Sequence, residues 1–81
     1  MMQPVQRTLP LAMAGTGARV RLVEVTGNQR SARRLAELGM IPGSHLTIMN
    51  DHGGTLLIAV GDTRLALGAG VAHSVLVSAL D

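Results

Sequence analysis

Hydrophobic and polar residues follow two different periods along this chain, and the change of period separates the expected elements. From Arg19 to Val25 the residues alternate between two faces, with Val20, Leu22 and Glu24 on the same face. Alternation with a period of two residues is typical of a strand that buries one of its sides. We therefore expect a strand over this segment, with Val20 and Leu22 directed into the core.

The next segment, Gln29 to Leu38, changes to the helical period. Its small and apolar side chains recur at spacings that bring them to one face of a helix, whereas its arginines point outward. The residues of the apolar face are Ala32, Leu35, Ala36 and Leu38. Asn28 precedes this segment and is expected to cap the helix, because its side chain can accept a hydrogen bond from a free backbone N–H group.

A corner is expected where the helix ends, within Leu35–Gly43, which reads Leu-Ala-Glu-Leu-Gly-Met-Ile-Pro-Gly. Gly39 can adopt the left-handed conformation that often ends a helix. The apolar pair Met40-Ile41 follows, and Pro42-Gly43 then forms a second turn. We assign Gly39, Pro42 and Gly43 a structural role, because they set the angle between the helix and the next strand.

After the corner, short apolar segments alternate with tight turns that contain glycine. We expect strands at Ser44–Asn50, Thr55–Val60, Thr63–Leu67 and Ser74–Ser78, turns at Asp51–Gly54 and Gly61-Asp62, and one helical turn at 68–72. Residues 1–8 show no period and are expected to be a flexible N-terminal tail, which leaves residues 9–81 as one domain. About five strands with one inserted α-helix predict a mainly β fold, a small, partly open β-barrel.

The composition of the 81 residues excludes several classes of function. The chain has no aromatic residue and no cysteine, and its formal net charge is only +2. Single-stranded nucleic-acid binders stack bases on aromatic rings, and nucleic-acid binding in general uses a dense basic patch, so no nucleic-acid partner is expected. Disulfides and thiolate metal sites are excluded. The longest later apolar run, Leu56–Val60, is too short to span a bilayer, so no direct membrane insertion is expected.

One block of the sequence resembles a known family. Arg34–Gly43 (Arg-Leu-Ala-Glu-Leu-Gly-Met-Ile-Pro-Gly), followed at the right distances by the apolar segments 46–48, 57–61, 65–67 and 72–77, is similar to the FeoA family, small cytosolic proteins of bacterial ferrous iron uptake. The resemblance covers residues 9–77. It implies an SH3-like barrel with an inserted helix, a cytoplasmic location and a non-enzymatic, regulatory role through contact with FeoB, the membrane GTPase that moves ferrous iron.

The candidate partner surface is the corner together with the outer face of the helix. Leu38, Met40 and Ile41 are predicted to expose an apolar shoulder, since methionine suits adaptable interfaces. Arg33 and Arg34 are predicted to steer the domain toward an acidic surface on the GTPase or at a membrane face. Two alternatives stay open at this point: Met40 can instead fill a gap in the core, and the arginines can form an ordinary solvated face.

The candidate metal ligands are Asp51 and His52, with Glu24, His45 and His73 as weaker candidates. No H-x-x-H or H-E-x-x-H spacing occurs, so no single element carries a chelating pair. At a loop tip, Asp51 and His52 could bind zinc where two subunits meet, and the alternative is an ordinary polar turn. No cofactor is expected to be required. No nucleophile–base pattern and no phosphate loop is present, so we do not expect an enzyme.

A second function and a second mode of assembly remain as alternatives. A freestanding domain of this kind could respond to zinc or iron by oligomerising on metal binding. An apolar barrel of this size could also form a homodimer through an edge strand.

Overall fold

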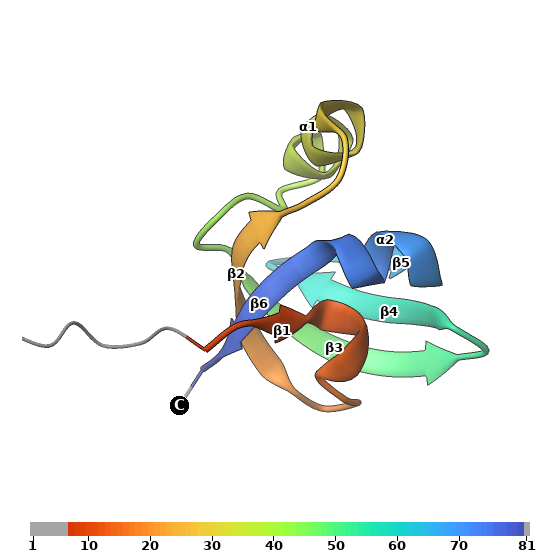
Figure 1. The fold of residues 1–81 in the computed structure, drawn as a ribbon. Coiled ribbons are helices and arrows are strands. Elements are labelled where there is room, and N and C mark those ends of the chain that lie inside the picture. The colour runs from red at the N-terminus through yellow and green to blue at the C-terminus, as the bar shows by residue number, and fades with distance from the viewer. Residues whose placement is uncertain (1–6, 81) are drawn as a thin grey trace, which may run out of the picture.

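The structure, a computed structural model, describes residues 7–80. The strands in this range form one six-stranded antiparallel sheet. The strands are β1 (Leu9–Pro10), β2 (Arg19–Val25), β3 (His45–His52), β4 (Thr55–Val60), β5 (Thr63–Leu67) and β6 (Val75–Ala79), and the helices are the 3₁₀ turn η1 (Leu11–Met13), α1 (Gln29–Glu37) and α2 (Ala69–Ser74). The order across the sheet is β1-β6-β2-β3-β4-β5. Because β1 and β5 stand at its two ends, the barrel is open between them. Figure 1 shows α1 projecting away from the sheet, between β2 and β3 in the chain.

The core lies on one side of the sheet, where the strands direct every second side chain inward. Its buried hydrophobic residues are Leu11, Val20, Leu22, Leu35, Met40, Leu46, Ile48, Leu56, Ile58, Leu67, Ala72, Val75 and Val77. The helix α2 and the turn η1 pack together and contribute Ala72 and Leu11, which are both 0% exposed. The mainly β, partly open barrel with one inserted helix is therefore confirmed, and α2 is a second, shorter helix where a single turn was predicted.

A bulge in β2 changes which residues of that strand face the core. The pairing with β6 shifts register between Leu22 and Glu24, so that Val23 is an extra residue in β2. An extra residue reverses the alternation beyond it. Val25 consequently packs against the core and Glu24 is exposed, so the predicted position of Glu24 on the inner face is wrong.

One strand is longer than predicted, and one strand was not predicted. The strand β3 continues to His52, which pairs with Thr55, so the turn consists only of Gly53 and Gly54. Asp51 and His52 are strand residues because the opposite strand β4 supplies them with backbone partners. The short segment β1 adds a sixth strand by pairing with β6.

The predicted tail, residues 1–8, lies mostly outside the described part of the chain, which includes only Arg7 and Thr8 of that segment, both exposed. Among residues 7–80, no helix combines the length and the apolar character needed to cross a membrane.

Candidate functional site

The helix α1 begins and ends with local hydrogen bonds that the sequence can encode. At its start, the Ser31 N–H group donates to Asn28 Oδ1 at 2.8 Å, which confirms the predicted cap. At its end, the Gly39 N–H group donates to the Ala36 carbonyl at 3.0 Å, and the Met40 N–H group donates to the Leu35 carbonyl at 2.9 Å. These two bonds define a Schellman motif, with Gly39 in the left-handed region at φ +94°.

The same motif explains the burial of Met40. In a Schellman motif the residue after the glycine commonly makes a hydrophobic contact with the helix residue five positions earlier, which here is Leu35. Both side chains belong to the core, with Leu35 4% exposed and Met40 1% exposed. The prediction that Met40 exposes an apolar shoulder is therefore wrong, because the helix stop turns this side chain inward.

The side chain of Ser44 fixes the backbone of the corner at residues 39–43. Its hydroxyl group accepts a hydrogen bond from the Ile41 N–H group at 3.1 Å and donates one to the Gly39 carbonyl at 2.8 Å. The backbone then joins β2, since the Gly43 N–H group donates to the Leu22 carbonyl at 2.8 Å. These bonds tie both turns of the corner to each other and to the sheet.

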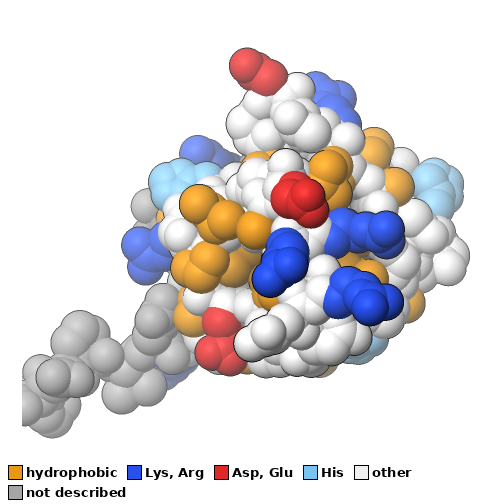
Figure 2. All heavy atoms as spheres, turned by 90° about the horizontal axis from the view of Figure 1, so that it is seen from above, with side chains coloured by type: hydrophobic (Ala, Val, Ile, Leu, Met, Phe, Trp, Pro, Cys, Tyr) orange, Lys and Arg blue, Asp and Glu red, His pale blue; other side chains and the backbone are white. Residues whose placement is uncertain are grey.

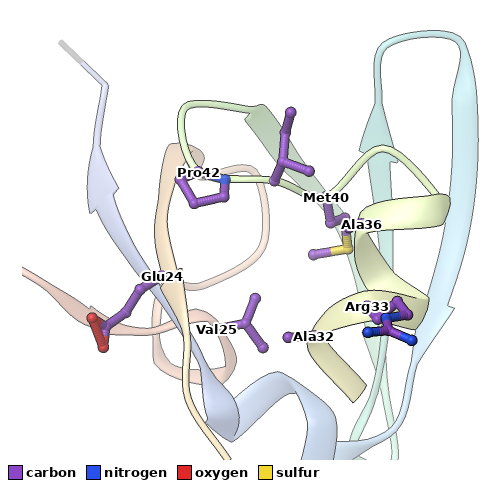
Figure 3. A pocket seen from close by; sticks show the side chains of 8 residues that line it. Glu24, Val25, Ala32, Arg33, Ala36, Met40 and Pro42 are labelled. Carbon is purple, nitrogen blue, oxygen red and sulfur yellow. The ribbon is translucent and has the colours of Figure 1, made fainter. Parts of the chain in front are cut away.

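Between α1 and β2 the corner encloses a groove of about 500 Å³. The residues that line this α1 groove are Glu24, Val25, Ala32, Arg33, Ala36, Met40, Ile41 and Pro42. In Figure 3, Val25 and Ala32 approach each other across the gap and the sulfur of Met40 is directed into it, while the Glu24 carboxylate points away. The groove thus has an apolar floor, with an arginine and a glutamate among its lining residues.

Several predicted partner residues meet at this groove, and others lie beside it. Arg33, Met40 and Ile41 line it, whereas Arg34 and Leu38 are not part of its lining. Ile41 is 51% exposed and Leu38 is 43% exposed, as predicted for an apolar shoulder. Arg33 and Arg34 are exposed, and Figure 2 shows basic side chains beside a hydrophobic patch on the side where α1 projects.

Sequence reasoning missed three residues of the groove wall. Ala32 and Ala36 were placed on the apolar face of the helix together with Leu35, but Ala36 is exposed and both alanines line the groove. Val25 reaches the groove because the bulge in β2 turns it inward. The small side chains on α1 were a usable signal, since alanines on a helix face leave room for another group. The alternation of polar and apolar residues along β2 gave no indication of the bulge.

The metal candidates do not come together in one copy of the chain. Among residues 7–80 no group of three or more His, Asp or Glu side chains could hold a metal ion. His45 and His52 stand at opposite ends of β3, about 23 Å apart along an extended strand. His73 lies in α2, and Glu24 lies in β2. Asp51 and His52 alone provide fewer ligands than a four-coordinate zinc ion requires.

An open antiparallel barrel, with a helix inserted after β2 and a partly apolar groove beneath that helix, defines a small SH3-like domain. The sequence profile of the FeoA domain matches residues 9–79. The chain therefore belongs to the FeoA family, whose members are accessory proteins associated with ferrous iron transport. A search of curated proteins finds no match.

Solved structures agree with this assignment. An iron uptake regulatory protein (FeoA) has 30% sequence identity and a TM-score of 0.83, over 91% of this chain and 99% of the other. FeoA from Stenotrophomonas maltophilia, solved in complex with zinc, has 31% identity and a TM-score of 0.74, over 84% of this chain and 87% of the other.

The fold is also shared with a part of larger regulators. A manganese-dependent transcriptional repressor has a TM-score of 0.87 at 19% identity, over 95% of this chain but only 44% of the repressor. At this level of identity the likeness concerns the fold alone.

Proposed function

We propose that this protein is a non-enzymatic, cytoplasmic accessory component of ferrous iron uptake that binds the membrane GTPase FeoB through the α1 groove. The observation that carries the proposal is the groove itself, an apolar hollow of about 500 Å³ between α1 and β2 in a chain of the FeoA family. Exposed large apolar side chains next to such a hollow are typical of interaction sites.

The arrangement suits a partner segment that inserts apolar side chains and carries negative charge. Val25 and Ala32 offer an apolar floor beneath which Met40 is buried, while Ile41 at the rim is half exposed. Arg33 lines the groove, and its neighbour Arg34 extends the positive charge along the exposed side of α1. Charges at the edge of an interface steer encounter, and apolar anchors near its centre supply most of the affinity.

The experiment measures the affinity of the purified protein for the cytosolic part of FeoB in each nucleotide state. Ile41→Asp is expected to weaken binding on the order of 10-fold or more, because it places a charge at an apolar contact. Arg33→Glu is expected to slow association and to reduce its dependence on salt. Met40→Asp is unsuitable as a probe, since it would place a charge in the core.

Met13→Asp is the matched control. Met13 is 68% exposed and lies on η1, which Figure 1 shows on the other side of the molecule from α1, so this change keeps the same chemistry but leaves the groove intact. Equal loss of binding in Ile41→Asp and Met13→Asp would argue against the groove as the contact. Absence of binding in every nucleotide state would exclude FeoB as the partner.

A second candidate function is metal-dependent association, favoured by one observation. A relative at 31% identity was solved in complex with zinc. One copy of this chain lacks three clustered ligands within residues 7–80, so a zinc ion would need ligands from two copies. We propose His52, at the exposed end of β3, as the ligand that each copy contributes, since the side chain of its strand neighbour Asp51 points to the opposite face of the sheet.

Sedimentation with and without zinc tests this second candidate. The expected result is a zinc-dependent increase in mass that His52→Ala abolishes and that His73→Ala, on α2, leaves unchanged. An unchanged mass of the unmodified protein on addition of zinc would exclude metal-dependent association.

A further inference from the structure

The outer face of the sheet, opposite the core, carries a group of arginines that the sequence pattern did not single out. Arg19 and Arg21 are neighbours on the outer side of β2, two residues apart, and both are exposed. Arg64 occupies the outer side of β5 and is also exposed. We call Arg19, Arg21 and Arg64 the arginine face.

The strand register places these arginines on one surface. Residues that pair across strands lie on the same side of a sheet, and the pairs here form a continuous row. This row runs Arg19–Thr47–Ala59–Arg64 from β2 to β5. Three strand spacings separate its ends, which corresponds to about 14 Å measured along the sheet. Arg21 lies beside the row, about 7 Å from Arg19 along β2.

No acidic side chain pairs with the arginine face within residues 7–80. The cross-strand partners of Arg21 are His45 and Ser78, and those of the other two arginines are Thr47 and Ala59. The four described acidic residues lie elsewhere: Glu24 beyond the bulge of β2, Glu37 on α1, Asp51 opposite Leu56 near the end of β3, and Asp62 in the β4–β5 turn, two residues before Arg64. The positive charge of this face is therefore uncompensated by direct neighbours across the strands.

An exposed apolar side chain adjoins the arginine face. Met49 follows Thr47 by two residues on β3 and is 39% exposed, at the bulge where β3 shifts register against β4. Basic side chains beside an exposed apolar one suit the boundary between headgroups and acyl chains in a lipid surface. Nucleic acid is a poorer match, since the chain has no aromatic residue on which a base could stack.

We propose that the arginine face binds a membrane surface that contains anionic phospholipids. Each arginine near such a surface strengthens binding about 5-fold, so three together contribute on the order of 100-fold. The face is separate from the α1 groove, whose lining residues include none of these three arginines. Binding to lipid can therefore coexist with occupation of the groove, and it requires no other protein.

Flotation with lipid vesicles at low ionic strength tests the proposal. The protein is expected to bind mixed vesicles of phosphatidylglycerol and phosphatidylcholine and not vesicles of phosphatidylcholine alone. Binding is expected to fall as salt is added, because exposed charges are screened over about 8 Å at physiological ionic strength. The variant Arg19→Gln/Arg21→Gln/Arg64→Gln is expected to lose on the order of 100-fold in vesicle partitioning.

A second triple variant is the matched control. Arg30→Gln/Arg33→Gln/Arg34→Gln removes the same three charges from the formal net charge of +2, but from α1. It is expected to keep most of the binding to the mixed vesicles. The charge-preserving variant Arg19→Lys/Arg21→Lys/Arg64→Lys is also expected to bind, and it separates loss of charge from loss of fold.

Three results would overturn the proposal. Equal loss in the two glutamine triple variants would show that net charge matters and that the face does not. Absence of binding to the mixed vesicles at low salt would exclude the lipid surface. Tighter binding to duplex DNA than to these vesicles, lost in the same arginine-face variant, would assign the face to nucleic acid instead. None of these results depends on whether FeoB binds.

Discussion

At the scale of single residues, the backbone conformation of Gly39 sets the direction of the chain after α1. Its φ of +94° lies in a region that residues with a Cβ atom rarely adopt, while the nearest atom to an added Cβ, on Val60, would be 3.7 Å away. Gly39→Ala is therefore expected to lower stability by about 1–2 kcal/mol through backbone strain and not through a clash. Urea unfolding monitored by circular dichroism measures this change.

Gly70→Ala is the control for that prediction. Gly70 lies within α2, has no positive φ, and has open space where a Cβ would be added. Alanine is expected to stabilise the protein here by about 0.4–1 kcal/mol, because it reduces the freedom of the unfolded chain. A loss of stability at both positions would contradict the assignment of the Gly39 effect to its left-handed conformation.

Met40 is the residue whose role the structure changes most. It is 1% exposed, and truncation of a buried methionine leaves a cavity. Met40→Ala is expected to cost about 2–5 kcal/mol of unfolding free energy. Met13→Ala, at a side chain that is 68% exposed, is expected to change stability by about 0.5 kcal/mol or less. Similar unfolding midpoints for the two variants would show that Met40 is not a core residue in solution.

At the scale of elements, α1 depends on its ends more than on its packing. Leu35 is its only buried residue, so the helix gains little from the core. Asn28→Ala removes the bond to the Ser31 N–H group and is expected to cost about 1 kcal/mol. The loss is expected to appear first as faster amide hydrogen exchange in α1, while β2 and β6 remain protected. Asn28→Asp keeps a capping acceptor and is expected to retain the slow exchange.

At the scale of the whole molecule, the sheet is continuous only when the last strand, β6, is present. The strand β6 lies between β1 and β2, and its side chains Val75 and Val77 are both 0% exposed. A chain truncated after Ser74 is expected to lose cooperative unfolding altogether, because a domain of this size has little core to spare. Calorimetry of the truncated and full chains measures this, and a retained transition at the same temperature would contradict it.

Local structure was largely predictable. The positions of α1 and of the strands β2 to β5 follow from hydrophobic period and turn residues, and the Asn28 cap and the Gly39 helix stop follow from residue chemistry. Each of these features depends on neighbours close in the sequence. The family resemblance added the SH3-like fold, which the structure and the comparisons confirm.

The groove was only partly predictable, since it depends on pairing between distant segments. The bulge at Val23 exists because β2 must match β6, which lies about fifty residues later in the chain, and nothing in the local alternation marks it. It turns Val25 inward and leaves Glu24 exposed. The extension of β3 to His52 likewise depends on partners in β4.

The corner at residues 39–43 shows where the two kinds of information meet. By itself the sequence determined that a helix ends there, because a left-handed glycine and a proline–glycine turn are local requirements of the backbone. The helix stop also brings Met40 to Leu35, but only the tertiary structure decided that this pair lies in the core while Ile41 stays at the surface. That choice depends on the angle between α1 and the sheet, which is set by packing and by hydrogen bonds to β2 that join residues far apart in the chain.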